Sequence, residues 1–276
     1  MPYFETNDHT SLYYRDWGTG DPVVFVSSVV LSGAMWEYQM LYLCDQGLRC
    51  LAYDRRGHGR SDDPGRRYDM NTLADDLAQL LVHLDLHNVT LIGQSMGCTE
   101  IARYLTRHGT DRIARVALIG TITPCLLRSD DNPEGAPREV FEALVAAQLR
   151  DRPYFNNEAG AIKFFGLGSR WPQPDLVSPE MRQWLMRLIL ETSPRAAIEC
   201  FRSFWLDDFR PDMQAFTVPT LIIHGQIDQN APLQCAQRTA RAISGSQLKI
   251  YEGAAHALYI THKDRLNRDL LEFIPS

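Results

Sequence analysis

The sequence lacks several features that would mark a location or a partner. No apolar run approaches the roughly 18 residues of a membrane span, and the N-terminus has no basic segment followed by the apolar core of a secretory signal. Basic residues are not in excess, because 28 Lys and Arg stand against 34 Asp and Glu, a net charge of −6. No basic excess is therefore available to neutralise the phosphates of nucleic acid or of an anionic membrane, which argues against such partners. We expect a cytoplasmic protein without nucleic-acid or membrane partners, and the sequence leaves assembly as a homo-oligomer open.

The spacings of common metal and cofactor sites are also missing. The six cysteines are scattered, without the short paired spacing of a zinc site, and we expect them to be free thiols. His83 and His87 stand four residues apart in a predicted helix, but no third ligand accompanies them. Gly18-Thr19-Gly20 lacks the third glycine of a dinucleotide loop, and it precedes a strand. We therefore predict neither a metal nor a cofactor.

What is present is an ordinary globular composition, with 45% of the 276 residues hydrophobic. Apolar runs alternate with stretches of helical periodicity, such as the leucine pattern that follows Asp69. The predicted strands cover residues 11–17, 22–30, 48–54, 89–93, 115–120, 220–224 and 247–251. This alternation predicts an α/β fold, with a mostly parallel sheet covered by helices on both faces.

The alternation stops between residues 124 and 218, where no strand signal occurs. Helices are predicted there over residues 138–150, 179–191 and 195–206. We therefore predict a core made of residues 1–124 and 217–276, with a helical cap inserted at 125–216. The cap carries aromatic residues that either form its own core or line a pocket: Phe141, Phe155, Phe164, Phe165, Trp171, Trp184, Phe201, Phe204 and Trp205.

The sharpest motif is Gly93-Gln94-Ser95-Met96-Gly97, between a predicted strand and a predicted helix. In that context G-x-S-x-G forms a tight turn that lifts the serine hydroxyl above the edge of the sheet. The N-terminus of the following helix then points at the hydroxyl. We predict that Ser95 is a catalytic nucleophile.

A serine nucleophile needs a base, and the base needs an acidic partner. His256 follows the predicted strand 247–251 in a loop of small residues, and Asp228 follows the strand 220–224. Both therefore lie beyond the C-terminal ends of strands, where sites form in open parallel sheets. The rival position after the strand 115–120 offers no carboxylate. We predict that His256 is the base and that Asp228 orients it.

These residues resemble the α/β-hydrolase superfamily along nearly the whole chain. Within it, the segment Tyr53-Asp54-Arg55-Arg56-Gly57-His58-Gly59-Arg60-Ser61 is similar to the cofactor-free haloperoxidases and their aryl-esterase relatives. The resemblance implies acyl transfer through a serine ester. It also implies an oxyanion hole made of two backbone amides, which by register are those of Val29 and Met96.

The loop that supplies the first of these amides departs from the family. Ser27 and Ser28 replace the usual His-Gly pair, and with Val29 they resemble the enol-lactonases. The two hydroxyls either shape the loop through local hydrogen bonds to the backbone or are inert. Cys98 stands where a second glycine often follows the nucleophile, and we expect its thiol to pack.

The expected function is cleavage of a small or medium carboxylic ester through an acyl-enzyme. Three alternatives remain: a lactonase similar to the enol-lactonases, a cofactor-free perhydrolase or haloperoxidase, and a non-catalytic receptor for a small molecule. Perhydrolase members often carry proline where Val30 stands, which ranks that activity below hydrolysis. Receptors derived from hydrolases have often lost a triad member, whereas all three residues are present here.

Overall fold

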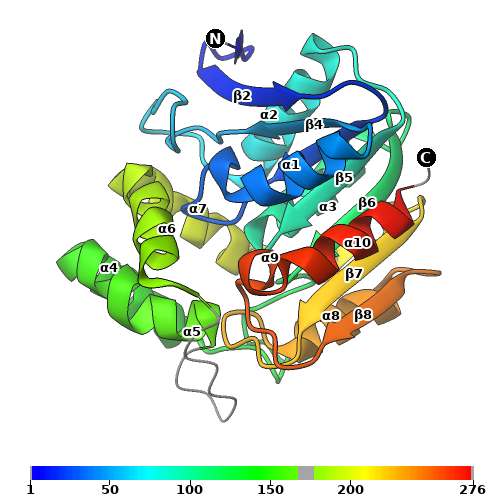
Figure 1. The fold of residues 1–276 in the computed structure, drawn as a ribbon. Helices are drawn as coiled ribbons and strands as arrows, with labels where there is room; N and C mark the ends of the chain where they lie inside the picture. The colour runs from blue at the N-terminus through cyan, green and yellow to red at the C-terminus, as the bar shows by residue number, and fades with distance from the viewer. Residues whose placement is uncertain (1, 167–176, 275–276) are drawn as a thin grey trace.

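A computed structural model of the chain describes residues 2–166 and 177–274. An eight-stranded sheet runs through its centre in the order β1-β2-β4-β3-β5-β6-β7-β8 (Figure 1). Strand β2 pairs in an antiparallel manner with both β1 and β4, and the other neighbouring strands pair in parallel, which confirms the predicted α/β class. The strands are β1 Tyr3–Glu5, β2 Ser11–Trp17, β3 Pro22–Val26, β4 Arg49–Tyr53, β5 Val89–Gln94, β6 Ile113–Ile119, β7 Thr220–Gly225 and β8 Gln247–Tyr251.

Helices cover both faces of this sheet because successive strand residues point to opposite sides. On one face, the sheet packs against α2 (Met70–His83), α3 (Met96–His108) and α8 (Leu233–Ala242). The buried side chains of the sheet on this face include Val24, Leu91 and Val116. Val23 and Ile92 lie on the other face, under α1 (Glu37–Asp45) and α10 (Lys263–Phe273). Two short helices, η1 (Gly33–Trp36) and α9 (Leu258–Thr261), complete this second layer.

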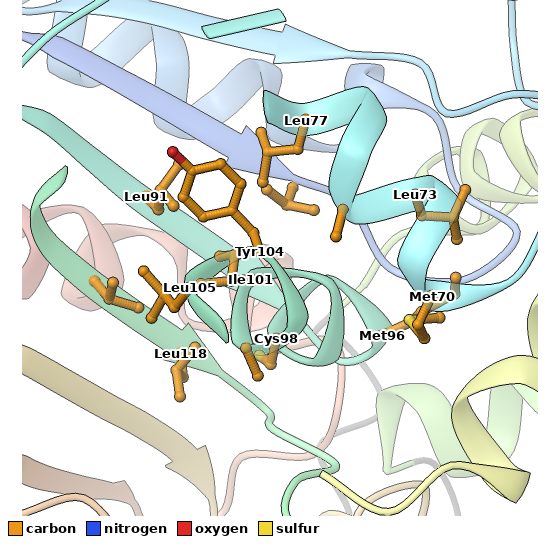
Figure 2. Close-up of a cluster of buried hydrophobic side chains, with 14 of the residues drawn as sticks. Met70, Leu73, Leu77, Leu91, Met96, Cys98, Ile101, Tyr104, Leu105 and Leu118 are labelled. Carbon is orange, nitrogen blue, oxygen red and sulfur yellow. The ribbon is translucent and has the colours of Figure 1, made fainter. Parts of the chain in front are cut away.

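Helix α2 follows the leucine pattern seen in the sequence. The Asp69 carboxylate caps its first turn by accepting the Thr72 amide at 3.1 Å. Leu73 and Leu77 are fully buried against α3, as Figure 2 shows. The prediction that His83 and His87 share this helix was wrong, because α2 ends at His83. Among the described residues, no group of three possible ligands could hold a metal ion.

Other boundaries also differ from the prediction. Strand β3 stops at Val26, since the chain then turns into the loop 27–32, so the expected strand 22–30 was too long. The short strand β1 and helix α1 were not predicted. Within the described residues, no helix has the length and apolar character needed to cross a membrane.

The segment between β6 and β7 is helical. It holds α4 (Arg138–Phe155, kinked at Asp151), η2 (Asn156–Gly160), α5 (Ala161–Phe165), α6 (Pro179–Glu191), α7 (Pro194–Leu206) and η3 (Pro211–Ala215). Figure 1 shows α4, α5 and α6 to one side of the sheet. Its described residues form two isolated β-bridges but no strand. Trp171 lies outside the described residues, and the division into core and cap stays a prediction.

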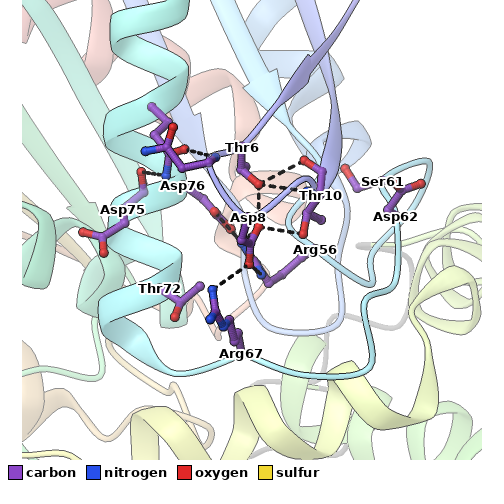
Figure 3. Close-up of polar contacts among 12 residues, drawn as sticks. Thr6, Asp8, Thr10, Arg56, Ser61, Asp62, Arg67, Thr72, Asp75 and Asp76 are labelled. Carbon is purple, nitrogen blue, oxygen red and sulfur yellow. Dashed lines mark hydrogen bonds and ion pairs between the residues drawn. The ribbon is translucent and has the colours of Figure 1, made fainter.

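A network of polar side chains fixes the turn between β1 and β2 to α2 (Figure 3). The Asp8 carboxylate accepts hydrogen bonds from the hydroxyls of Thr6 and Thr10 at 2.6 and 2.8 Å. The buried Arg56 guanidinium donates to Asp8 at 3.0 Å and to both oxygens of Asp76 at 2.7 and 2.6 Å. This cluster has a structural role.

Candidate active site

Ser95 stands on a strained turn between β5 and α3. Its backbone has φ 55° and ψ −115°, a region that residues with a side chain rarely occupy. Its amide donates to the Ile119 carbonyl of β6 at 3.0 Å, which fixes the turn to the sheet. The side chain is largely buried, and it borders a cavity. Backbone strain at a serine whose side chain borders a cavity is typical of a functional residue.

The glycines on either side of the turn are required by close packing. A Cβ on Gly93 would lie 2.8 Å from the Gly97 backbone, and a Cβ on Gly97 would lie 2.3 Å from the Val26 carbonyl oxygen. Because Gly97 allows this approach, the first turn of α3 packs directly against the end of β3. The motif therefore brings Ser95 next to the loop that follows β3.

His256 and Asp228 come from neighbouring loops, after β8 and β7, and the structure brings them into contact. His256 Nδ1 lies 2.6 Å from Asp228 Oδ2, and both residues are buried. The second oxygen, Asp228 Oδ1, accepts the amides of Asn230 and Ala231, each at 2.8 Å. With Nδ1 engaged in this way, Nε2 is the ring nitrogen left to exchange a proton with a substrate or a nucleophile.

Neighbouring side chains fix this pair in place. Gln94, directly before Ser95, donates its amide to the His256 carbonyl at 3.2 Å. The Phe164 ring of α5 lies 5.7 Å from the His256 ring in an edge-on arrangement. His224 lies 3.7 Å from Asp228 Oδ2, and burial lowers its pKa.

Two backbone amides near Ser95 have no acceptor among the described residues, those of Val29 and Met96. Met96 opens α3, where first-turn amides lack an intrahelical partner and the helix dipole is positive. Val29 lies in the loop 27–32 and borders the same cavity as Ser95 and His256. Free amide donors of this kind are able to stabilise a negative oxygen.

Of the two interpretations that the sequence left open for the hydroxyls of Ser27 and Ser28, the structure favours inert side chains. Ser27 Oγ is buried without a hydrogen-bond partner, and no bond of the Ser28 hydroxyl occurs with the described residues. The loop is held through its carbonyls instead, since Arg55 binds those of Ser27 and Ser28, and Thr192 Oγ1 donates to that of Val30 at 2.9 Å. Val30 itself has φ 59°, a left-handed conformation that is rare for a β-branched residue.

The cavity above Ser95 and His256 has a volume of about 740 Å³. It extends between the sheet and the helical segment, and its interior is largely apolar. The aromatic residues of that segment that line it are Phe141, Phe155, Phe164, Phe165, Phe201, Phe204 and Trp205. Trp184 does not line it, and packs edge-on against Tyr38. The cavity suits a small molecule with an apolar body.

Three other residues singled out in the sequence have structural surroundings. The Cys98 thiol is buried under the nucleophile turn, 3.3 Å from the Gly93 carbonyl, and burial raises its pKa to about 12. His58 is fully buried, and its pKa is lowered by burial to about 3. His87 bonds to Asp85 at the surface. No pattern in the sequence pointed to Arg55 as a residue beside the site, because it was noted only as part of a family motif.

Comparisons with known proteins identify the family of the chain. The model of a family described as the alpha/beta hydrolase fold matches residues 21–263. A non-heme chloroperoxidase of Kitasatospora aureofaciens is 39% identical over 277 residues, covering 99% of each chain. A bifunctional esterase/perhydrolase of Acinetobacter calcoaceticus is 33% identical over 279 residues and the full length of both chains. An esterase structure from Exiguobacterium antarcticum has a TM-score of 0.93 at 30% identity, covering 99% of both chains. The family model covers most of the chain, and Ser95, Asp228 and His256 follow the ends of parallel strands of the sheet. The chain therefore belongs to the alpha/beta hydrolase family.

Proposed function

We propose that this protein is a serine hydrolase that cleaves small or medium carboxylic esters through an acyl-enzyme. The observation that carries the proposal is the arrangement around one cavity. Ser95 borders it on a strained turn, and His256 borders it with Nδ1 bound to Asp228. A nucleophile, a base and an orienting carboxylate in this arrangement are the parts of a catalytic triad.

The reaction follows from these positions. The Ser95 hydroxyl attacks the ester carbonyl while His256 Nε2 takes its proton, and the Val29 and Met96 amides stabilise the oxygen that becomes negative. The intermediate then collapses, and His256 gives the proton to the departing alcohol. Water next attacks the acyl-enzyme, with His256 again as the base, and releases the acid and free Ser95. Asp228 stabilises the imidazolium that forms in each half of the reaction.

A cavity of about 740 Å³ with aromatic walls supports an ester with an apolar acyl or alcohol group. A lactone offers the same carbonyl chemistry in a ring, so lactone hydrolysis is the first alternative. Perhydrolysis is the second, in which hydrogen peroxide replaces water in the attack on the acyl-enzyme and a peracid is released. It is supported by the relatives named as a chloroperoxidase and an esterase/perhydrolase.

A panel of substrates separates these activities. We expect phenyl acetate and phenyl butyrate to be hydrolysed with higher kcat/KM than simple lactones. Bromination of a phenolic dye should require both peroxide and a carboxylic acid such as acetate. A fluorophosphonate should label the protein once, as measured by intact mass. No hydrolysis, no bromination and no label would contradict the proposal and favour a non-catalytic receptor.

A substitution at Val30 tests how much the reaction depends on the loop that carries the Val29 amide. Proline holds φ near about −65° and cannot adopt the φ of 59° that Val30 has. The loop must therefore change its course in Val30→Pro, which displaces the Val29 donor. We expect kcat for phenyl acetate to fall by about tenfold or more, up to the roughly 10²–10³-fold cost of losing an oxyanion donor.

The control for this change is Val30→Gly, because glycine adopts a positive φ without strain. Steady-state kinetics should give it a kcat within about threefold of the wild type. If Val30→Pro matched Val30→Gly, the course of the loop would have no influence on catalysis. Bromination measured on the same proline variant shows whether it gains perhydrolysis as hydrolysis is lost.

A further inference from the structure

Arg55 is a buried cation beside the proposed oxyanion hole, and the reaction as described does not use it. It follows β4 and is only 2% exposed. Its Nη2 donates to the Ser27 carbonyl at 2.9 Å, and its Nη1 lies 3.4 Å from the Ser28 carbonyl. Its Nε donates to Glu100 Oε2 at 2.8 Å. One guanidinium thus contacts the loop after β3 and the helix after β5.

Glu100 anchors this arginine from the nucleophile helix. It is fully buried on α3, one turn after the Met96 amide. Its other oxygen, Oε1, accepts the hydroxyl of Tyr53, the last residue of β4. The carboxylate therefore joins the end of β4 to the helix that begins at the nucleophile. A buried carboxyl group needs hydrogen-bond partners, and both partners of Glu100, Tyr53 and Arg55, lie at the end of β4.

The contact with Ser28 has a stereochemical consequence for Val29. The Ser28 carbonyl and the Val29 amide belong to the same planar trans peptide, in which C=O and N–H point to opposite sides. A guanidinium that holds the carbonyl on its own side therefore directs the amide to the other side. The Leu31 amide also donates to the Ser28 carbonyl at 3.4 Å, and Thr192 Oγ1 donates to the Val30 carbonyl at 2.9 Å. Arg55 adds to these contacts a link from the loop to Glu100 on α3.

We propose that Arg55, anchored by Glu100, is the positioning residue that sets the oxyanion hole, by orienting the Val29 amide and holding its loop against the helix of Met96. This inference rests on the proposed hydrolase function. It assigns to a buried arginine the task that the family gives to a His-Gly pair absent here. Arg55 touches no reacting atom, so its contribution is geometric.

The neighbouring Arg56 provides a matched control. It is also buried, at 1% exposure, and it also binds carboxylates, those of Asp76 and Asp8 (Figure 3). Its hydrogen bonds to described residues reach neither the loop 27–32 nor α3. A purely structural role predicts the same effect from both arginines, whereas a positioning role predicts an effect on catalysis from Arg55 alone.

The experiment compares Arg55→Lys with Arg56→Lys in the full chain. Lysine keeps the charge for Glu100 but has no planar fork to reach two carbonyls and a carboxylate together. For Arg55→Lys we expect kcat for phenyl acetate to fall at least about tenfold, with KM within about threefold of the wild type. Inhibition by trifluoroacetophenone, whose hemiketal oxygen occupies the hole, should weaken by the same factor. Inhibition by the product phenol should not change.

Arg56→Lys should lower Tm but leave kcat and trifluoroacetophenone inhibition within about threefold of the wild type. Equal kcat losses in the two variants, or a loss in Arg55→Lys without weaker trifluoroacetophenone inhibition, would overturn the proposal. If Arg55→Lys does not fold, the double variant Arg55→Met/Glu100→Met removes both charges together and is measured in the same way. An active Ser95→Ala variant would instead contradict the hydrolase function itself, so the two failures are distinguishable.

Discussion

Replacing Ser95 with alanine is expected to lower kcat for phenyl acetate by roughly four to six orders of magnitude. The variant retains the cavity, the His256–Asp228 pair and the two free amides, so substrate binding should persist with little change in KM. What is lost is the atom that forms the acyl-enzyme. Labelling by a fluorophosphonate should disappear with the activity, because both need the same oxygen.

The control for this prediction is a serine that does not border the cavity. Ser203 is half-buried on α7, where its hydroxyl donates to the Cys200 carbonyl at 3.2 Å. Ser203→Ala should keep kcat within about threefold of the wild type. A Ser95→Ala protein that hydrolyses phenyl acetate at the rate of Ser203→Ala would contradict the assignment of Ser95 as nucleophile.

The strain at Ser95 adds a second measurement to the same series. Alanine keeps a Cβ in the conformation with φ 55°, whereas glycine occupies it without steric cost. Ser95→Gly should therefore have a free energy of unfolding about 1 kcal/mol higher than Ser95→Ala, measured by urea denaturation. Both variants should be inactive. A gain in stability accompanying the loss of activity is the mark of strain that is kept for function.

The positions of the three proposed catalytic residues in the fold were predictable because they depend on chain connectivity. Ser95, Asp228 and His256 each follow a buried apolar strand, and parallel strands bring their C-terminal ends to one edge of the sheet. Tight turns and small residues mark these positions in the sequence. The mostly parallel sheet follows from the same pattern, since continuous apolar runs separated by helical periodicity leave few other arrangements.

The surroundings of these positions were not predictable, since they depend on contacts between distant segments. Arg55 reaches the Ser27 carbonyl across 28 residues of sequence and Glu100 across 45. No local periodicity encodes such a contact. In the same way, composition does not distinguish Phe164, which packs on His256, from Trp184, which packs on Tyr38. The three-residue strand β1 is too short to produce a pattern.

The second large effect is expected from Asp228→Asn, an isosteric change that should reverse the proton arrangement of His256. The two oxygens of Asp228 have different partners, because Oδ1 accepts two backbone amides and Oδ2 faces His256 Nδ1. In the variant, the asparagine side chain has only one oxygen, and the amides of Asn230 and Ala231 both need it as their acceptor. Its NH₂ group must then face Nδ1.

An NH₂ group donates to Nδ1, so the proton of the neutral imidazole moves to Nε2. Nε2 then has no lone pair with which to accept the Ser95 proton, and the imidazolium loses its carboxylate partner. We expect kcat for phenyl acetate to fall by about 10⁴-fold while KM changes little.

Asp212→Asn is the control, since Asp212 is also buried and accepts a hydrogen bond from Arg103 at 3.1 Å, away from the cavity. That variant should lose stability but keep kcat within about threefold of the wild type. If Asp228→Asn kept more than about a tenth of the wild-type kcat, Asp228 would not be the residue that orients His256.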